Sequence, residues 1–240
     1  MAATAAFSSA ARHACHGLEP QRFAVFGYAH VPWFKRHQRL LDESSLPRSP
    51  ERFEQAAAIR EILTSLGYDP IGLNHYARPR DALAVAARAR RLHRNFQGYT
   101  TDDAGALIGF GSSAIGRLPQ GFIQNASDMA SYSRAISSNS FATVRGLALS
   151  SADRIRGRII EELMCHLSCD VGALVDEYNH RQDSFEQEFR ALLPFVTDGY
   201  VRIEGNHILV HECGRPFLRL IAGAFDEYLP SSCARHSAAV

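Results

Sequence analysis

The sequence predicts an α/β protein in two parts, residues 21–150 and residues 151–240. In the first part, short apolar runs alternate with a helical pattern, and the order strand, helix, strand indicates a βα repeat with a parallel sheet. In the second part, helical segments surround one pair of short alternating strands. The 46% hydrophobic content of the 240 residues is enough for a substantial core.

Charge and composition exclude several classes of protein. The net charge of +1 and the pI near 7.8 give no electrostatic reason to expect binding to nucleic acid or to a membrane surface. No apolar run approaches the roughly 18 residues of a transmembrane helix. The five cysteines are odd in number and scattered, which is typical of a reducing compartment, so we expect a cytoplasmic protein. Residues 1–20 lack the basic and apolar segments of a signal peptide and predict an unstructured leader.

The first part is expected to begin with a strand. The continuous apolar run 23–28 suits a strand that is buried on both faces. A helix should follow, with Ser49 as its N-cap, Pro50 at its first position and Gly67 just beyond its end. A second short strand is predicted at 71–73.

Further along, apolar runs and cap residues predict three more elements. The run 107–111 indicates another buried strand, and it leads into a loop of small residues that extends to Gly121. A helix is expected from Ser127 to about Ser138, and a short strand is expected at 144–149.

The second part is predicted to be mostly helical. Ser150 and Ser151 should cap a helix with one apolar face, formed by Ile155, Ile159, Leu163 and Leu167. Two helices, a hairpin with its turn at Gly205-Asn206 and a final helix should follow; the predicted ranges are 171–178, 184–195, 199–204 with 207–210, and 214–228. This order is similar to a winged-helix module. DNA binding is not expected, because the chain has one lysine, Lys35, and its helices lack a basic stripe.

One glycine motif has the spacing of a dinucleotide-binding fingerprint. Gly109, Gly111 and Ala114 match that pattern, but the fingerprint must open a helix, and Pro119 and Gly121 would interrupt one here. We therefore interpret the segment as a small-residue loop whose backbone a ligand could approach closely.

Cysteine and histidine spacing does not predict a metal site. Cys165 and Cys169 lie four residues apart on a predicted helix, but no second pair with zinc-ligand spacing follows, so buried thiols are the better interpretation. His30, His75 and His93 lie at strand ends or in loops and are the more interesting histidines. Any one of them alone is more often a hydrogen-bonded structural residue.

The run His93–Thr101 is the most informative stretch of the chain. It interleaves the rings of Phe96 and Tyr99 with amide, guanidinium and hydroxyl groups around Gly98. A flat ligand with polar edges needs this mixture of apolar walls and orienting groups. An ordinary buried turn is the other interpretation of the run.

Four segments of the chain together resemble oxygen-independent coproporphyrinogen III oxidases, which are radical S-adenosylmethionine enzymes of haem biosynthesis. The segments are Phe26–Pro32, Ile71–Pro79, His93–Thr101 and Leu107–Ile115, and the resemblance extends over roughly residues 20–230. It implies that residues 21–150 are the C-terminal portion of a partial (β/α) radical-SAM barrel. It also implies that residues 151–240 form a helical, winged-helix-like C-terminal domain with a β-wing.

The same resemblance implies S-adenosylmethionine and a [4Fe–4S] cluster as cofactors. Ala29 and Ile115 match family positions that contact S-adenosylmethionine, and Phe96 and Gln97 match residues that line a second S-adenosylmethionine site. These roles suit the residues, because Phe96 offers a ring face, Gln97 a bidentate amide, and Ala29 and Ile115 an apolar floor.

The chain also departs from the family pattern. The family's Cys-x-x-x-Cys-x-x-Cys motif, which ligates the cluster, is absent from this sequence, so no catalytic or metal-binding residue is assigned to it. Asn74 and Tyr76 replace the more usual Asp and Phe, and Arg80 stands where an acid is common. These changes put the local electrostatics in doubt.

We expect the chain to be the C-terminal half of such an enzyme. The complete enzyme oxidatively decarboxylates coproporphyrinogen III to protoporphyrinogen IX, and this chain alone should be inactive because the cluster-binding half is missing. Beside the porphyrinogen substrate, a separately encoded N-terminal half is a candidate partner. The alternative is a non-catalytic accessory protein that binds a tetrapyrrole or a nucleoside.

Overall fold

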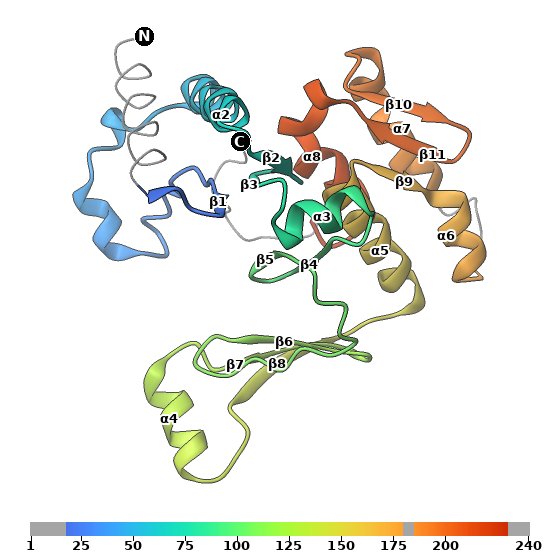
Figure 1. Ribbon diagram of the computed structural model, residues 1–240. Coiled ribbons are helices and arrows are strands. Elements are labelled where there is room, and N and C mark those ends of the chain that lie inside the picture. Colours follow the sequence, from blue (N-terminus) through green and yellow to red (C-terminus); the bar gives the residue numbers. More distant parts are fainter. Residues whose placement is uncertain (1–17, 180–184, 230–240) are drawn as a thin grey trace.

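The computed structural model describes residues 18–179 and 185–229. Figure 1 shows a main body and an arm, residues 105–149, that projects away from it. Most of the predicted leader, residues 1–17, lies outside the described residues, and so does residue 184, the predicted start of one helix. The described part contains no helix that is both long enough and apolar enough to cross a membrane.

The first sheet of the body is antiparallel, so the predicted parallel sheet is wrong. Its strands are β1 (Arg22–Ala24), β2 (Asp69–Ile71) and β3 (His75–Ala77), in the order β1-β3-β2. Both outer strands run antiparallel to β3. The strands β1 and β2 do run in the same direction, but β3 returns directly after β2 through a tight turn at Gly72 and separates them.

The predicted buried strand at 23–28 is also wrong. Within this range only residues 23–24, the end of β1, form a strand. The strand β1 lies at the edge of its sheet, and Phe26 beyond it is 67% exposed. A strand is buried on both faces only where neighbouring strands and covering layers surround it. The strand β3, its sole partner, is three residues long, so the pairing ends after the Val25 amide donates to the Asn74 carbonyl (2.9 Å).

The predicted first helix is confirmed, and it begins one residue earlier than expected. Two short 3-10 helices, η1 (Arg36–Leu40) and η2 (Glu43–Ser45), precede α2 (Ser49–Ser65). The N-cap is Arg48 rather than Ser49, and the Arg48 amide donates to the Glu51 carboxylate (2.5 Å). Gly67 follows the helix with a φ of +80°, as expected for its C-terminal end.

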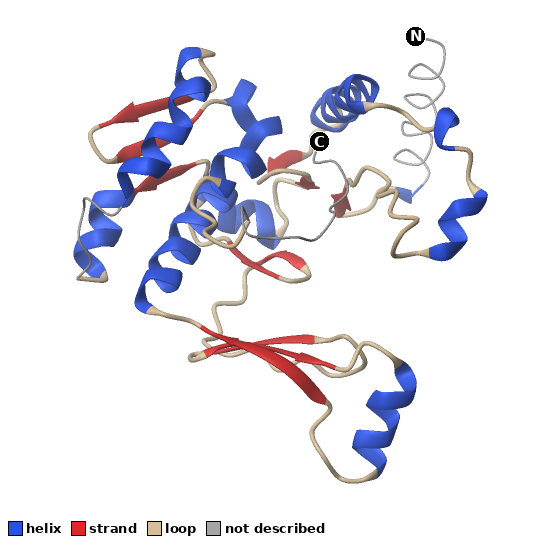
Figure 2. Cartoon of the chain, turned by 180° about the vertical axis from the view of Figure 1, so that it is seen from behind, coloured by secondary structure: helices blue, strands red, loops and turns tan. Residues whose placement is uncertain are grey.

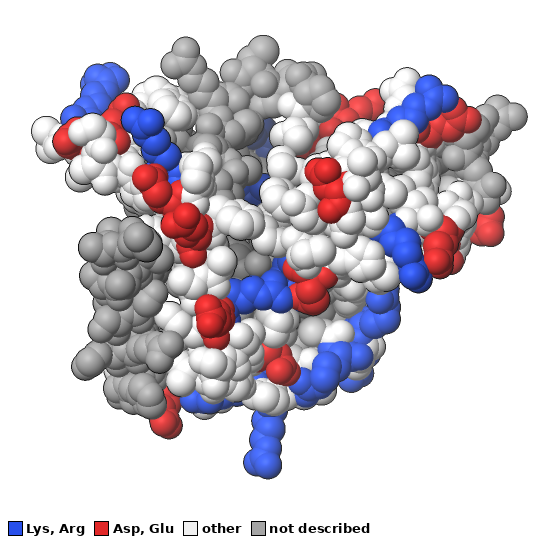
Figure 3. Space-filling model, turned by 90° about the horizontal axis from the view of Figure 1, so that it is seen from above, with Lys and Arg blue, Asp and Glu red and all other residues white. Residues whose placement is uncertain are grey.

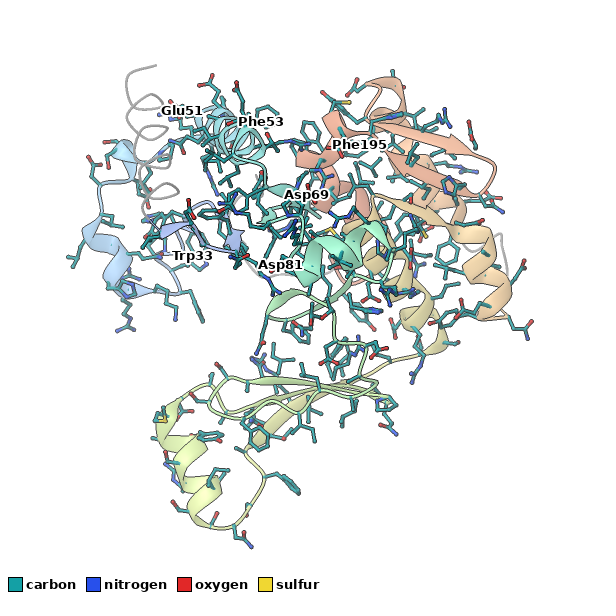
Figure 4. All side chains as sticks on the ribbon, viewed as in Figure 1. Trp33, Glu51, Phe53, Asp69, Asp81 and Phe195 are labelled. Carbon is teal, nitrogen blue, oxygen red and sulfur yellow. The ribbon has the colours of Figure 1, made fainter. Side chains whose placement is uncertain are left out.

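A short helix, α3 (Ala82–Arg88), was not predicted. Its N-cap is Asp81, whose carboxylate accepts from the Leu83 amide (2.8 Å) and pairs with Arg22 of β1 (2.8 Å). At its other end Arg88 pairs with Asp69 of β2 (2.5 Å). Figure 4 labels Asp69 and Asp81, the acidic partners in these two ion pairs. Both ion pairs fix α3 to the first sheet.

The arm is a three-stranded antiparallel sheet with one helix. Its strands are β6 (Ile115–Leu118), β7 (Gly121–Asn125) and β8 (Thr143–Ala148), in that order, and its helix is α4 (Met129–Ser137). The helix at 127–138 and the strand at 144–149 are therefore confirmed.

The predicted strand at 107–111, in contrast, is wrong. That segment forms a single bridge between Leu107 and Arg117, and Phe110 is 89% exposed. The strand β6 lies in the predicted small-residue loop, because Gly121 permits a tight turn that pairs β6 with β7. A Cβ at Gly121 would overlap the Leu147 carbonyl.

The predicted long helix of the second part is confirmed as α5 (Ser151–His166). Ser150 caps it, since its hydroxyl accepts from the Asp153 amide (3.1 Å) while the Asp153 carboxylate accepts from the Ser150 amide (2.8 Å). Ile155, Ile159 and Leu163 are fully buried on one face. Leu167 ends the helix in a left-handed conformation.

The remaining elements pack around a second small sheet, which Figure 2 shows with its covering helices. They are β9 (Ser168–Asp170), β10 (Val201–Glu204), β11 (His207–Val210), α6 (Val171–Glu177) and α7 (Glu186–Thr197). The predicted hairpin is confirmed, and β9 adds an antiparallel third strand beside β11. The predicted final helix, 214–228, is shorter and divided into η4 (Glu212–Phe217), which contains Pro216, and α8 (Leu218–Gly223).

Two apolar clusters join the parts of the body. The larger cluster lies among α5, α6, α7, α8 and the second sheet, and the smaller one is formed by Ile71, Ala77, Leu83, Leu92 and Tyr99. Cys165 of α5 is a member of the smaller cluster. On α2, Phe53 stacks with Phe217, which also packs against Phe195 of α7; Figure 4 labels both outer rings. Acidic and basic side chains are interspersed on the face shown in Figure 3.

Candidate functional site

The run His93–Thr101 forms a hairpin of β4 (His93–Asn95) and β5 (Gly98–Thr100). Its turn is closed by the Gln97 amide, which donates to the Asn95 side-chain oxygen (2.8 Å). Phe96 at the tip is 54% exposed, and Gln97 is also exposed. The hairpin therefore presents one ring and one carboxamide to the solvent, and it is not the ordinary buried turn that was the other interpretation.

Glu161 of α5 holds the first strand of this hairpin. One carboxylate oxygen accepts from the Arg94 amide (3.1 Å) and lies 3.3 Å from His93 Nδ1. The other oxygen accepts from the Arg158 guanidinium (2.8 Å). Burial alone would raise the pKa of Glu161, but these hydrogen bonds and charges outweigh burial, so its pKa is lowered and the carboxylate is ionised.

Tyr99 holds the second strand. Its hydroxyl accepts from the Leu73 amide (2.9 Å) and donates to the Met164 carbonyl of α5 (3.0 Å). Burial raises the pKa of Tyr99, so the phenol keeps the proton that it donates. One side chain thus connects the hairpin, the turn after β2 and the long helix.

Three of the four segments that carry the family resemblance, Phe26–Pro32, Ile71–Pro79 and His93–Thr101, meet at His75. The ring edge of His75 contacts Phe26 (5.8 Å between centroids) and Tyr99 (5.0 Å). Its Nδ1 lies 3.0 Å from the Asn74 side-chain oxygen, and a Cβ built on Gly98 would lie 3.2 Å from its Nε2. Because that oxygen can only accept, Nδ1 carries the proton and Nε2 is left as an acceptor beside the glycine.

The histidine is kept neutral by its surroundings. Burial of the ring lowers the pKa of His75, and the charge of Arg94 lowers it further. The Arg94 guanidinium lies over the Tyr99 ring at 5.4 Å. A neutral imidazole and a cation therefore stand together at the base of the hairpin.

The second part of the chain also supports the turn that precedes β3. Arg215 of η4 is buried and donates to the Gly72 carbonyl. Glu212 holds Arg215 through two hydrogen bonds (2.6 and 3.1 Å) and also pairs with Arg60 of α2. Hydrogen bonding from Arg215, then from Arg60, lowers the pKa of Glu212 to about 2, so this carboxylate stays charged.

The structure places the four predicted cofactor-binding residues in three elements. Phe96 packs edge-on against Phe122 of β7 (5.3 Å), which brings the hairpin tip against the arm that contains Ile115. Ala29 lies in the loop after β1, where its carbonyl accepts from the Gln38 side chain (3.1 Å). Within the described chain, no hydrogen bond or ring contact joins Ala29 or Ile115 directly to Phe96 or Gln97. Their roles toward S-adenosylmethionine stay predictions.

Sequence reasoning missed the residues that hold the site together. Glu161 and Arg215 lie far from the hairpin in sequence, and no motif marks them. Gly72 belongs to the segment Ile71–Pro79, but nothing in that segment marks it as a support of the hairpin. Their roles depend on which helix packs against which turn. Of the three histidines singled out, His75 is central, His93 pairs with Glu161, and His30 pairs with Glu43 (2.9 Å) at the edge of the body. The substituted Tyr76 lies in the core.

The described residues do not fit an iron–sulfur cluster. No three Cys, His, Asp or Glu side chains in residues 18–179 and 185–229 lie close enough together to hold a metal ion. Cys165 and Cys169 are buried, and burial raises the pKa of each thiol to about 12. The expectation of buried thiols is thus confirmed for these two cysteines.

Comparison with known proteins identifies close relatives. No family model matches the chain. The oxygen-independent coproporphyrinogen III oxidase of Bradyrhizobium diazoefficiens is 45% identical over 223 residues, which are 93% of this chain and 50% of that protein. The enzyme of the same description from Cereibacter sphaeroides is 42% identical over 88% of this chain and 47% of its own length.

A solved structure gives the same result. Coproporphyrinogen III oxidase from Escherichia coli, described as a radical SAM enzyme, superposes with a TM-score of 0.88 and 34% identity over 94% of this chain and 52% of that one. The resemblance of the four sequence segments is thereby confirmed. The chain spans about half the length of the relatives that it matches.

Proposed function

Given that this chain is homologous to oxygen-independent coproporphyrinogen III oxidases over about half of their length, we propose that it is the C-terminal half of such an enzyme. The complete enzyme would oxidatively decarboxylate two propionate side chains of coproporphyrinogen III to vinyl groups, and so produce protoporphyrinogen IX. This half would contribute binding groups rather than the cluster.

The His93–Thr101 hairpin is the observation on which this proposal rests. Hydrogen bonds to Glu161 and Met164 of α5 hold the hairpin in place, and the ring of Phe96 and the carboxamide of Gln97 at its tip are accessible. A flat ligand with polar edges could stack on the ring and pair with the amide. We propose that Phe96 and Gln97, with Ala29 and Ile115, hold S-adenosylmethionine. When bound, that cofactor would supply the radical for hydrogen abstraction from a propionate.

The cluster must then be bound by polypeptide outside this sequence, because no three of its cysteines have the Cys-x-x-x-Cys-x-x-Cys spacing. We propose that the chain alone does not turn over, and that an N-terminal half of the enzyme is its partner. Exposed apolar side chains on the arm support a polypeptide partner, since soluble proteins rarely leave so many uncovered. They include Phe141 (95% exposed), Phe110 (89%) and Val144 (63%).

The test is anaerobic turnover of coproporphyrinogen III with S-adenosylmethionine and a reductant. The chain alone should form no protoporphyrinogen. Addition of the N-terminal half of the Bradyrhizobium relative should restore formation, and Phe96→Ala with Gln97→Ala should abolish it. The matched control is Gln187→Ala, which removes an exposed carboxamide from α7, and its activity should equal that of the wild type.

The second candidate is the accessory protein that binds a tetrapyrrole or a nucleoside without catalysis. It is favoured by the accessible ring of Phe96 and carboxamide of Gln97, which can hold a flat ligand without a cluster. Binding of coproporphyrin III by the chain alone, with no activity after the N-terminal half is added, would select this function. Turnover by the chain alone would contradict both candidates.

A further inference from the structure

We propose that the Arg94 guanidinium is a binding site for a ligand carboxylate, and specifically for a propionate of the porphyrinogen. The proposal rests on the proposed function for the identity of the ligand. It rests on the structure for the site itself. Arg94 lies on β4, at the base of the hairpin whose tip presents Phe96 and Gln97.

The Arg94 side chain is partly buried and lacks an anionic partner. Its Nε is fully buried and makes no hydrogen bond, and none of the ion pairs in the described chain includes Arg94. The contact of its guanidinium is the face of Tyr99, at 5.4 Å. A buried N–H group without an acceptor costs free energy, and here that group belongs to a cation. A ligand that supplies the missing carboxylate would remove this cost.

No neighbouring group can serve as that partner. Glu161 lies against this residue, but it accepts from the Arg94 backbone amide, and its oxygens are already engaged by His93 and Arg158. The rings of Tyr99 and His75 are uncharged, since burial disfavours the charged form of each. The positive charge of Arg94 is therefore left for a ligand.

The chemistry around Arg94 matches a carboxylated macrocycle. A guanidinium binds a carboxylate through two parallel hydrogen bonds, which fix its direction as well as its position. The rings of Phe26 and Phe96 are both more than half exposed. Phe26 packs against His75, and Phe96 follows Arg94 by two residues on the same hairpin. Flat apolar walls with one fixed cation suit a tetrapyrrole that carries propionates.

The experiment titrates the full chain with coproporphyrin III and with its tetramethyl ester, which has no free carboxylate, and follows porphyrin fluorescence. We expect Arg94→Gln to weaken binding of the acid about 10- to 100-fold, the loss of one charge-assisted hydrogen-bonding group, and to leave ester binding unchanged. Arg94→Lys should restore part of the affinity, because it keeps the charge but loses the bidentate geometry. The control is Arg91→Gln, which removes an exposed arginine three residues before Arg94, and this variant should bind coproporphyrin III like the wild type.

A second measurement separates this inference from the proposed function. Sodium propionate is titrated while the Nε–H resonance of Arg94, assigned by its loss in Arg94→Lys, is followed by NMR. If the acid binds equally to wild type and Arg94→Gln, the inference is overturned and the proposed function stands. If no porphyrin binds but propionate shifts the resonance, Arg94 is a carboxylate site and the assignment of a tetrapyrrole as its ligand is wrong. If neither ligand binds, the inference is overturned as well.

Discussion

The phenol of Tyr99 lies directly against the backbone of Gly72, so closely that a Cβ at that glycine would overlap the Tyr99 ring and hydroxyl. The same hydroxyl binds the Leu73 amide and the Met164 carbonyl. Hairpin, turn and long helix are thus fitted together at one point. Phe96 and Gln97 are positioned by this contact without taking part in it.

The substitution Gly72→Ala should be strongly destabilising. Gly72 has a φ of +53°, so alanine would add left-handed strain to the overlap with Tyr99, and we expect a loss of roughly 2–5 kcal/mol in the free energy of unfolding. Urea denaturation measures it. Gly67→Ala is the control, because Gly67 also has a positive φ but open space around it, and it should cost about 1–2 kcal/mol. Equal losses in the two variants would contradict the role of Tyr99.

The substitution Tyr99→Phe should cost about 1–3 kcal/mol, because it leaves the buried Leu73 amide and Met164 carbonyl without a partner. Thermal unfolding followed by circular dichroism measures the change. Tyr28→Phe is the control, since the Tyr28 hydroxyl makes no hydrogen bond within the described chain and its side chain is exposed. An unchanged melting temperature for Tyr99→Phe would show that the hydroxyl does not hold the hairpin.

The substitution Glu161→Gln should loosen the hairpin. The amide can still accept from the Arg94 backbone, but it no longer balances the charge of Arg158, and we expect a loss of roughly 1–2 kcal/mol. Hydrogen exchange at the Arg94 amide should accelerate more than exchange in α5. Glu186→Gln, which breaks an exposed pair with Arg190, should change stability by less than about 1 kcal/mol.

Stability should fall as the pH decreases through the ordinary histidine range. Burial, and then the charge of Arg94, lowers the pKa of His75 in the folded state, so below a pH of about 6.5 the unfolded chain binds a proton that the folded chain resists. Burial lowers the pKa of His166 in the same direction. Urea unfolding at pH 7.5 and 5.5 should therefore show a smaller loss in His75→Gln than in the wild type. An identical loss of stability in His75→Gln and the wild type would exclude His75 as a source of the pH dependence.

The cysteines should react very differently with iodoacetamide at pH 8. Cys165 and Cys169 are buried with pKa values raised to about 12, whereas Cys213 is exposed. Peptide mass mapping should find Cys213 alkylated in the native protein, and Cys165 and Cys169 alkylated only after addition of urea. Rapid native labelling of Cys165 would mean that α5 does not pack against the hairpin as described.

Local signals predicted the starts of the two longest helices well, although α3 was missed. The pair Ser49-Pro50 marked the start of α2 to within one residue, and Ser150-Ser151 marked the start of α5. The glycine–asparagine turn marked the hairpin of β10 and β11. These signals work because a cap or a turn is satisfied by residues within a few positions of it.

Apolar runs predicted strands poorly. The runs 23–28 and 107–111 were expected to be buried, yet Phe26 and Phe110 are exposed. A short apolar run does not reveal which strand will pair with it, or whether any will. For the same reason the sequence did not reveal β3 and β6, whose pairing depends on tight turns at Gly72 and Gly121.

The sequence by itself determined the family resemblance, the starts of α2 and α5 and the hairpin of β10 and β11, because each of these depends on neighbouring residues. Only the tertiary structure decided that Glu161 and Tyr99 hold the hairpin of β4 and β5, that Arg215 holds the turn at Gly72, and that Arg94 on β4 has no acidic partner within the described residues. Those relationships join residues far apart in the chain. Their energies depend on burial and distance, which only the folded backbone fixes.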